Sequence, residues 1–339
     1  MKNEEINTLI SEKNFPESTL KAELIETHIS WVIICDEFVY KIKKPIRYSF
    51  LDFSTLEKRK FYCEREIELN KRIAYDVYLE VLPVKKNASK LFIGAAVGSV
   101  MDYAVKMRKL PQEKRMDKLL LKNEVSANDI YNLAMKIGNF HQHADVIYSD
   151  DISCMPELFN DILAQKEFIE EHLHCGNLIT DAVTASDKYI EINKAFLKQR
   201  ISNGFKRDCH GDLHSRNIFL VPAPQPFDCI EFNDSFRQTD VLNEIAFLCM
   251  DLDAFGRKDL SQLFFKNCNK FFPCITSQED EMLFIYYKAY RANIRAKVNA
   301  LRAKNAESED QQKHALSETH KYILLMNNYI GEIKSSLQL

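Results

Sequence analysis

Glycine is scarce in this chain of 339 residues, which contains 8 of them. That is about a third of ordinary usage. The first glycine along the chain is Gly94. The N-terminal third therefore has no glycine-rich loop of the kind that surrounds phosphate groups, and the sequence has no P-loop pattern anywhere.

The nine cysteines include no Cys-x-x-Cys pair and are irregularly spaced. An odd number at irregular spacing indicates reduced thiols rather than a disulfide framework or a zinc site. Long apolar runs are missing too, so no membrane-spanning helix is expected. The acidic start, Met1–Glu5, is not typical of a signal peptide.

A strong charge of either sign is also missing, because the net charge is −3 at pH 7. We therefore expect no nucleic-acid partner, no membrane partner and a cytoplasmic location. The hydrophobic content of 46% is enough to fill a substantial core. The length allows one large domain or two of ordinary size.

The residue pattern changes character near residues 107–111. Before that point it predicts a hairpin, one charged helix and three further strands, listed here by residue number: 29–35 with 38–43, then 55–73, 77–85, 90–95 and 103–107. An amphipathic helix within 5–25 is also expected, and Leu56, Phe61, Ile67 and Leu69 are the expected core contacts of the charged helix.

After that point the pattern is almost wholly helical over 117–200 and again from Asp240 to the end. One helix is expected over 128–141, capped by Ser126 to Asn128, and two short strands are expected over 218–221 and 227–232. The order predicts an α+β fold with a small β-rich lobe, 1–107, and a larger helical lobe, 108–339. A cleft between two such lobes is a favoured place for a ligand.

The strongest chemical signal is the segment His210–Asn217, which reads His-Gly-Asp-Leu-His-Ser-Arg-Asn before an apolar stretch. A carboxylate and an amide five positions apart suit phosphoryl transfer. Asp212 can accept or orient the proton of an attacking hydroxyl, and the side-chain oxygen of Asn217 can hold Mg²⁺. The spacing matches that of the kinase catalytic loop, with Gly211 in place of the usual arginine.

A second metal-binding carboxylate is expected beyond the loop, because two metals need at least one carboxylate besides the amide. Glu231 is favoured for this role, at the end of the strand expected over 227–232. Asp228 is the main rival, but strand alternation disfavours it. Asp234 is a weaker alternative.

The N-terminal third supplies the matching phosphate contacts. The stretch Phe38-Val39-Tyr40-Lys41 is similar to the Val-Ala-Ile-Lys strand of kinases, in which the lysine bonds the α- and β-phosphates. Alternation places Val39, which could cover an adenine, on one face with Lys41. Lys43 shares that face and is the alternative phosphate ligand. Another possibility is that these lysines have no ligand and lie on an edge strand, where they prevent aggregation.

In the charged helix that follows, Glu66 is expected to pair with the lysine, with Glu64 and Glu68 as competitors. His141 is expected to be a packing or capping histidine rather than a catalyst.

These motifs together resemble the aminoglycoside phosphotransferase and choline kinase superfamily, whose loop reads H-G-D-x-x-x-x-N. The stretch Ile230-Glu231-Phe232 is similar to its I-D-W/F metal motif, with Glu in place of Asp. The stretch from Asp240 to Ala246 resembles its D-x-x-x-D-L-A segment, with Glu244 replacing the second Asp. The match extends over most of the chain and is nearest to a bacterial branch of that superfamily.

The resemblance implies a protein-kinase-like two-lobed fold, ATP with Mg²⁺, and transfer of the γ-phosphoryl group to a hydroxyl of a small molecule. It also implies that Thr27 and Ser30, with backbone N–H groups, would contact the phosphates in place of glycines. The segment that bonds adenine would fall at 107–110, beginning with Met107.

The acceptor is expected to be chosen by the helical lobe. Lys288, Arg291 and Arg295 lie at i, i+3 and i+7 on one helical face. If that face lines the cleft, an anionic acceptor is expected, and the alternative is a solvated helix face. Three functions fit these residues: a small-molecule kinase, a protein kinase or nucleotidyl transferase on the same scaffold, and a non-catalytic nucleotide-binding pseudokinase.

Overall fold

The computed structural model describes residues 1–338 except 89, 96 and 150, and it divides into two compact units. The first unit comprises Met1–Leu119 and Arg216–Arg237, and the second comprises Leu120–Ser215 and Gln238–Leu339. The first unit holds an antiparallel sheet and the second is mainly helical, which confirms the predicted α+β class. The first unit thus extends beyond residue 107, and it also includes Arg216–Arg237, which follows the His-Gly-Asp loop in the sequence.

Among its described residues, the first unit contains eight strands before residue 110, two more after residue 215, and few helices. Its strands are β1 Glu23–Glu26, β2 Ser30–Ile34, β3 Phe38–Lys43, β4 Arg47–Tyr48, β5 Leu51–Asp52, β6 Tyr78–Asn87, β7 Lys90–Ile93, β8 Ser99–Arg108, β10 Ile218–Phe219 and β11 Gln225–Pro226. Its helices are α1 Asn3–Glu12, α2 Leu56–Lys71, the 3₁₀ turn η1 Gln112–Lys114 and α9 Asp234–Arg237, while α3 Met116–Leu121 ends just beyond Leu119.

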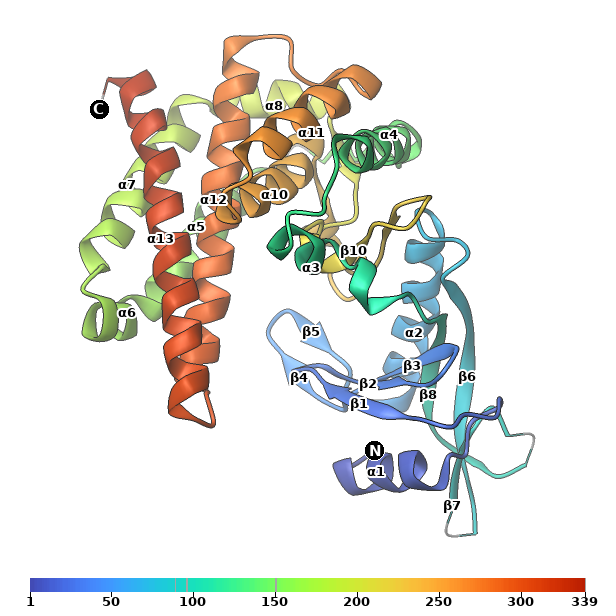
Figure 1. Cartoon of the computed structure of the whole chain (residues 1–339). Coiled ribbons are helices and arrows are strands. Elements are labelled where there is room, and N and C mark those ends of the chain that lie inside the picture. Colours follow the sequence, from blue (N-terminus) through green and yellow to red (C-terminus); the bar gives the residue numbers. More distant parts are fainter. Residues whose placement is uncertain (89, 96, 150, 339) are drawn as a thin grey trace. The chain divides into compact units, whose positions relative to one another are not determined.

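Six of these strands form one antiparallel sheet in the order β1-β2-β3-β8-β6-β7 (Figure 1). The predicted hairpin is confirmed, because β2 pairs with β3 from Ser30 opposite Lys43 to Ile34 opposite Val39. Strand β3 lies between β2 and β8. Strand β3 is therefore not an edge strand, and the alternative that its lysines prevent aggregation at a sheet edge is wrong.

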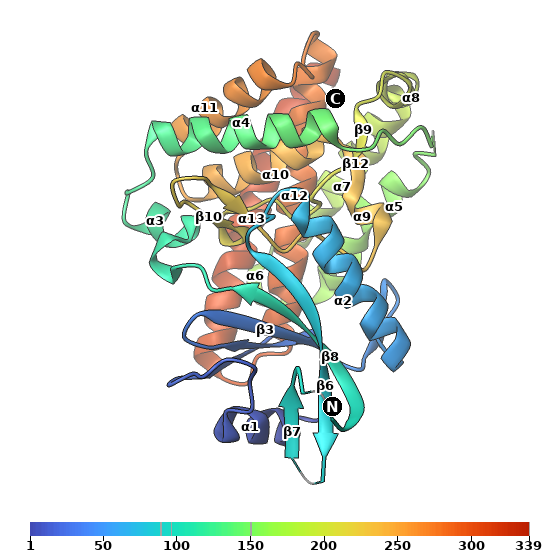
Figure 2. The same cartoon turned by 90° about the vertical axis from the view of Figure 1, so that its right-hand side faces the viewer.

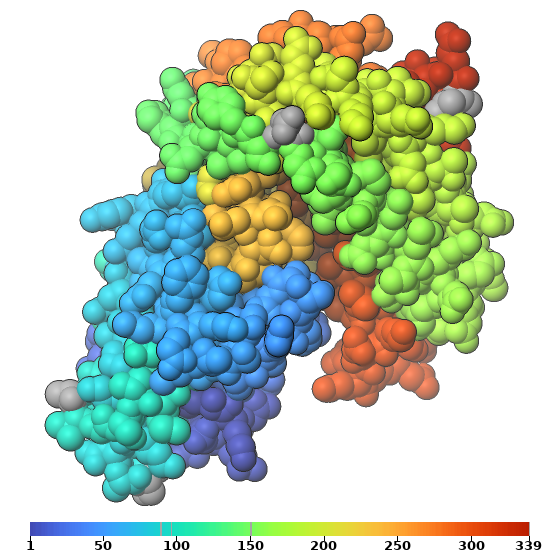
Figure 3. All heavy atoms as spheres, turned by 180° about the vertical axis from the view of Figure 1, so that it is seen from behind, coloured from blue at the N-terminus to red at the C-terminus, as the bar shows by residue number. Residues whose placement is uncertain are grey.

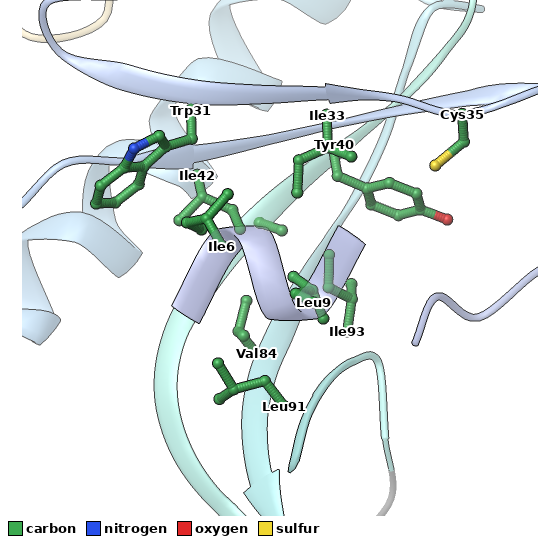
Figure 4. Packing of buried hydrophobic residues seen from close by; sticks show 11 residues of the cluster. Ile6, Leu9, Trp31, Ile33, Cys35, Tyr40, Ile42, Val84, Leu91 and Ile93 are labelled. Atoms are coloured by element: carbon green, nitrogen blue, oxygen red, sulfur yellow. The ribbon is translucent and has the colours of Figure 1, made fainter. Parts of the chain in front are cut away.

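One face of the sheet is covered by α1 (Figure 4). Ile6 and Leu9 of this helix pack against the side chains of Tyr40 and Ile42, which alternate along β3 with Val39 and Lys41. Residues two apart on a strand share a face. Lys41 and Lys43 therefore lie on the opposite face from α1, as the alternation predicts.

Helix α2 begins after Thr55, whose side chain accepts a hydrogen bond from the N–H of Lys58 and so caps the helix. Its buried residues are mostly polar or charged: Arg59, Cys63, Glu66, Leu69 and Asn70. The expectation that Phe61 is a core contact is wrong, since its side chain is 58% exposed. A helix that buries charged groups must supply them with partners.

The second unit is built mainly from helices. They are α4 Ala127–His143, α5 Cys154–Asn160, η2 Asp161–Gln165, α6 Lys166–Leu173, α7 Gly176–Ile192, α8 Lys194–Ser202, α10 Val241–Ala254, α11 Lys258–Phe271, α12 Gln278–Lys304 and α13 Glu309–Leu337. The His-Gly-Asp loop is preceded by β9 Lys206–Asp208, which pairs with β12 Gln238–Asp240, and is followed by the 3₁₀ turn η3 Ser215–Asn217, whose last two residues belong to the first unit.

Side-chain caps fix where the main helices of the second unit begin. Ser126 accepts a hydrogen bond from the N–H of Asp129 while Asp129 bonds the N–H of Ser126, so α4 starts with a capping box as the sequence predicts. Ser277 and Asp280 form the same motif at α12. Helix α4 packs on α11, and α12 packs along α13 (Figure 2).

Figure 3 shows the light-green segment with α6 and α7 on the surface of the second unit. No helix among the described residues is both long enough and apolar enough to span a membrane.

All nine cysteines are free thiols, and Cys154 is the exposed one while the other eight are buried.

Candidate functional site

In the second unit, the segment from His210 to His214 follows β9 as an irregular loop, and Ser215 begins η3. Gly211 has a φ of 86°, a left-handed conformation that costs glycine little and disfavours other residues. The replacement of the usual kinase arginine by Gly211 therefore agrees with the shape of this backbone.

Glu244 of α10 fixes the start of the loop. One of its carboxylate oxygens accepts hydrogen bonds from the N–H of His210 at 2.6 Å and of Gly211 at 2.7 Å. Its other oxygen lies 2.9 Å from Nε2 of His141 on α4, and both side chains are buried. His141 is thus a packing histidine, as predicted.

Two further side chains hold the loop backbone. Asp251 of α10 accepts a hydrogen bond from the N–H of Ser215 at 2.9 Å, and Arg291 of α12 donates to the carbonyl of Gly211 at 3.1 Å. Sequence reasoning missed Asp251. An acid within the apolar, wholly buried part of α10 was the available signal, because a buried carboxylate needs a partner.

Asp212 differs from its neighbours in the loop, because its side chain keeps 36% of its surface exposed while His210, Gly211 and Leu213 are buried. Its carboxylate lies 3.4 Å from Nε2 of His214. Burial acts to raise the pKa of Asp212, but the charges of His214, His210 and Arg295 outweigh it and hold that pKa below its ordinary value. Asp212 is therefore an ionised, accessible hydrogen-bond acceptor on a fixed loop.

His141, Cys209 and Glu244 also bring three possible metal ligands within 4.8 Å of one another. Glu244 already uses one oxygen for two backbone N–H groups and the other for His141. Its carboxylate therefore serves the loop, and the cluster is better explained as packing than as a metal site.

In the first unit, the expected pair of Lys41 and Glu66 is present, with Nζ and Oε1 2.9 Å apart. Lys43 uses the other oxygen of Glu66 at 2.7 Å, so one buried carboxylate serves both lysines. Glu64 and Glu68, which competed with Glu66 in the sequence, are exposed.

The pKa values in this cluster follow from its charges. Burial acts to raise the pKa of Glu66, but Lys41 and Lys43 outweigh it and lower that pKa to about 2. Burial acts to lower the pKa of Lys41, but Asp228 and Glu66 outweigh it, and the pKa lies well above its ordinary value. Both groups of the Lys41–Glu66 pair are therefore charged at neutral pH.

The segment that contains the candidate metal carboxylates is not a strand. Residues 227–232 have no strand structure, and Asp228 has a φ of 64°, so the expected strand and the alternation argument against Asp228 are both wrong. Glu231 is buried and forms an ion pair with Lys43, whereas Asp228 is 42% exposed and lies 2.6 Å from Lys41. Asn217 is also buried, at the end of η3. The assignment of Asn217 and Glu231 to a metal stays a prediction.

Thr27 closes the turn between β1 and β2. Its hydroxyl oxygen accepts the N–H of Ser30 at 2.9 Å and donates to the carbonyl of the same residue. The Ser30 side chain is buried and its hydroxyl has no hydrogen-bond partner among the described residues. Val39 and Met107 face each other across β3 and β8. The roles predicted for these four residues stay predictions.

The basic face of α12 is not a solvated surface, so that alternative is wrong. Lys288 lies 3.0 Å from Asp253, and Arg291 bonds Gly211 and Asn243. Arg295 is buried against the Tyr322 ring, and its Nε has no hydrogen-bond partner among the described residues.

The first unit also has a surface pocket of about 560 Å³. It is formed by the hairpin of β4 and β5 and by two aromatic rings from elsewhere in the same unit, and its lining residues are Arg47, Tyr48, Ser49, Phe50, Leu51, Asp52, Tyr62 and Phe232. None of the predicted site residues lines it, so we assign it no role.

Comparison with known proteins gives the fold but no activity. No protein-family model matches the chain. The uncharacterized proteins Rv2004c of Mycobacterium tuberculosis (strain H37Rv) and Mb2027c of Mycobacterium bovis are each 28% identical to it over 304 residues, which is 87% of this chain and 58% of theirs. The chain thus spans 58% of the length of these relatives.

Two solved structures share its fold over nearly their whole length. The choline kinase of Cryptosporidium parvum has a TM-score of 0.55 at 14% identity, with 97% of each chain covered. A thermostable mutant of the aminoglycoside phosphotransferase APH(4)-Ia has a TM-score of 0.51 at 10% identity, with 94% of this chain and 98% of that chain covered. The chain therefore has the kinase-like fold of choline kinases and aminoglycoside phosphotransferases, as the sequence motifs predicted.

Proposed function

We propose that this protein transfers the γ-phosphoryl group of ATP to a hydroxyl group of a small molecule. The observation that carries the proposal is the loop around Asp212. Buried side chains hold its backbone on both sides of an ionised carboxylate that keeps a third of its surface exposed. Such pre-organisation suits a residue that must meet a reacting group in one geometry.

In the proposed reaction, Asp212 accepts a hydrogen bond from the acceptor hydroxyl, orients its oxygen and takes its proton as the bond to phosphorus forms. ADP is the leaving group. A low pKa makes Asp212 a weak base, so orientation contributes more than proton removal at the start of the step.

Lys41 supplies positive charge for the phosphate oxygens, and Glu66 holds its ammonium in place. The pair is similar to the lysine–glutamate pair on which kinases depend. Val39 and Met107 would adjoin the adenine. The β1–β2 turn at Thr27 and Ser30 would contact phosphate through the hydroxyl of Ser30, which has no hydrogen-bond partner among the described residues.

The oxygen donors of Asn217, Asp228 and Glu231 fit a hard divalent cation, because Mg²⁺ prefers carboxylate and amide oxygens. Asn217 and a carboxylate of the segment from Asp228 to Glu231 would hold it. When bound, Mg²⁺ would neutralise the charge that develops on the transferred group.

Arg295 is the basic side chain of α12 that we propose for an anionic acceptor. Lys288 pairs with a carboxylate and Arg291 with the loop carbonyl. Arg295 contacts Tyr322, and its Nε has no hydrogen-bond partner among the described residues. A guanidinium N–H suits a carboxylate or phosphate group on the acceptor.

The decisive experiment uses a metabolite extract and ATP labelled on either the γ- or the α-phosphate. Label transferred only from γ-labelled ATP supports a kinase, transfer of α-label would indicate a nucleotidyl transferase, and labelled protein as product would indicate a protein kinase. Nucleotide binding without any transfer would indicate a pseudokinase.

The variant Asp212→Asn should lower turnover by about 10²- to 10⁴-fold, because it removes the base. ADP affinity, measured by calorimetry, should change little. The exposed residue Asp310 offers a control, Asp310→Asn, which should keep full turnover. Unchanged turnover in Asp212→Asn would contradict the role of this residue.

A further inference from the structure

The two carboxylates of the segment from Asp228 to Glu231 have opposite surroundings. Glu231 is buried and its partner Lys43 has no exposed surface. Asp228 keeps 42% of its side-chain surface exposed. Asp228 lies 2.6 Å from Lys41, but its exposed surface leaves this carboxylate open to a cation, whereas a cation could reach Glu231 only by breaking a wholly buried ion pair.

The ladder between β10 and β11 also favours Asp228. Ile218 pairs with Pro226, and the N–H of Phe227 donates to the carbonyl of Asn217 at 3.0 Å, which extends the pairing by one residue. Residues that face each other in an antiparallel pair lie about 5 Å apart. Asp228 is thus one residue beyond the position that faces Asn217, whereas Glu231 is four residues beyond it.

The backbone of Asp228 is held in place by the rest of the first unit. Its N–H donates to the hydroxyl of Tyr78 at 3.0 Å, and the next N–H, of Cys229, donates to the side chain of Asn70 at 2.9 Å. Tyr78 and Asn70 are both buried. These bonds stabilise the left-handed conformation of Asp228, which is costly for a residue other than glycine and is often found at functional sites.

Glu231 serves as a counter-ion of the buried Lys43. A buried ammonium group without a counter-ion is strongly unfavourable, and Lys43 has Glu66 and Glu231 as its carboxylate partners. Because Lys41 also uses Glu66, the second carboxylate keeps the buried charges balanced.

We propose that Asp228 acts together with Asn217 as the divalent-cation ligand, and that Glu231 is the buried counter-ion of Lys43. This inference rests on the proposed function. It assigns the cation to Asp228, whereas the sequence motif assigns it to Glu231. Its two halves predict opposite behaviour for two side chains that are three residues apart.

The test is calorimetric titration of the full chain with Mn²⁺ alone and with Mn²⁺ and ADP, combined with thermal unfolding without either. Asp228→Asn should weaken Mn²⁺ binding by about 10- to 100-fold and lower the Tm less than Glu231→Gln does, because Asp228 is partly exposed and Lys41 keeps Glu66 as a partner. Glu231→Gln should lower the Tm and keep the Mn²⁺ affinity within about threefold, as expected where no ligand is lost.

The reverse pattern, with Mn²⁺ binding lost in folded Glu231→Gln and kept in Asp228→Asn, would overturn the inference while the proposed function stands. If the unchanged protein binds neither Mn²⁺ nor ADP, the proposed function fails, and the cation assignment fails with it.

The Lys43–Glu231 pair has its own test, which needs no ligand. Lys43→Met and Glu231→Gln should each lower the Tm, and the double variant should have a higher Tm than Lys43→Met, because it leaves no lone buried carboxylate at position 231. A double variant whose Tm falls by the sum of the two single shifts would show that the two residues act independently.

Discussion

The two units hold their candidate residues by different physical means. In the first unit, charged side chains hold one another: Glu66 serves both Lys41 and Lys43, and Asp228 lies against Lys41. In the second unit, charged side chains hold a backbone, since Glu244 and Asp251 bind N–H groups of the loop.

Under the proposed function, this difference predicts what each unit would contribute. An ion-pair cluster sets the number and position of charges, which is what binding a polyphosphate requires. Carboxylates that bind backbone N–H groups set a shape, which is what orienting one catalytic carboxylate requires. The comparison predicts that charge changes damage the first unit most, whereas the second unit is sensitive to lost hydrogen bonds and to backbone conformation.

The largest effect on stability is expected from Glu66→Ala, which leaves two buried ammonium groups without their common partner. Loss of one member of a buried ion pair costs about 3–5 kcal/mol of the free energy of unfolding. Urea denaturation measures it. The matched control is Glu64→Ala on the same helix, where the side chain is exposed and the change should stay within about 0.5 kcal/mol. Equal effects of both substitutions would contradict the shared-partner interpretation.

Acid should weaken the same cluster gradually. Burial acts to raise the pKa of Glu66, but its two lysines lower it from 4.5 to about 2. A carboxyl group whose pKa is lower in the folded state adds stability that is complete above the unfolded-state pKa and is lost as the pH falls through the folded-state pKa.

The free energy of unfolding should therefore decrease between about pH 4.5 and pH 2. Denaturation at a series of pH values should give a flatter curve for Glu66→Gln than for the unchanged protein. Identical curves would show that Glu66 does not change its protonation on unfolding.

In the second unit, Glu244→Gln should cost about 1.5–3 kcal/mol, because hydrogen bonds to a charged acceptor become bonds to a neutral one. The exposed residue Glu332 on α13 provides the control Glu332→Gln, with little change expected. Thermal unfolding measures both. If Glu244→Gln matches its control, the carboxylate does not stabilise the loop.

The smallest effects are expected from a pair of glycine substitutions of opposite sign. Gly211→Ala should destabilise by about 1–2 kcal/mol, because its φ of 86° is left-handed. Gly331→Ala, in the interior of α13 with open space around an added Cβ, should stabilise by about 1 kcal/mol. Thermal unfolding of both variants checks the sign, and stabilisation by Gly211→Ala would contradict the strained-loop description.

Local patterns were enough to predict the elements that depend on near neighbours. The β2–β3 hairpin and the cap at Ser126 follow from such patterns, and the pairing of Lys41 with Glu66 follows from the similarity to the kinase motif. The order of motifs also predicted the kinase-like fold.

Long-range partners explain what the sequence did not reveal. The apolar residues over 227–232 predicted a strand, but the N–H groups of Asp228 and Cys229 bind side chains from β6 and α2 instead. Asp251 and Arg291 bind loop atoms that are 36 and 80 positions away in the chain. No periodicity within a short window reports such contacts.

The distribution of the thiols gives the molecule a set of chemical reporters. Cys154 alone is exposed, and burial raises the pKa of Cys63 in the first unit and of Cys249 in the second unit to about 12. A thiol-specific reagent should therefore modify Cys154 at once and the other cysteines only when the structure around them unfolds locally. Because buried thiols occur in both units, the order in which peptides become labelled in rising denaturant would reveal which unit opens first.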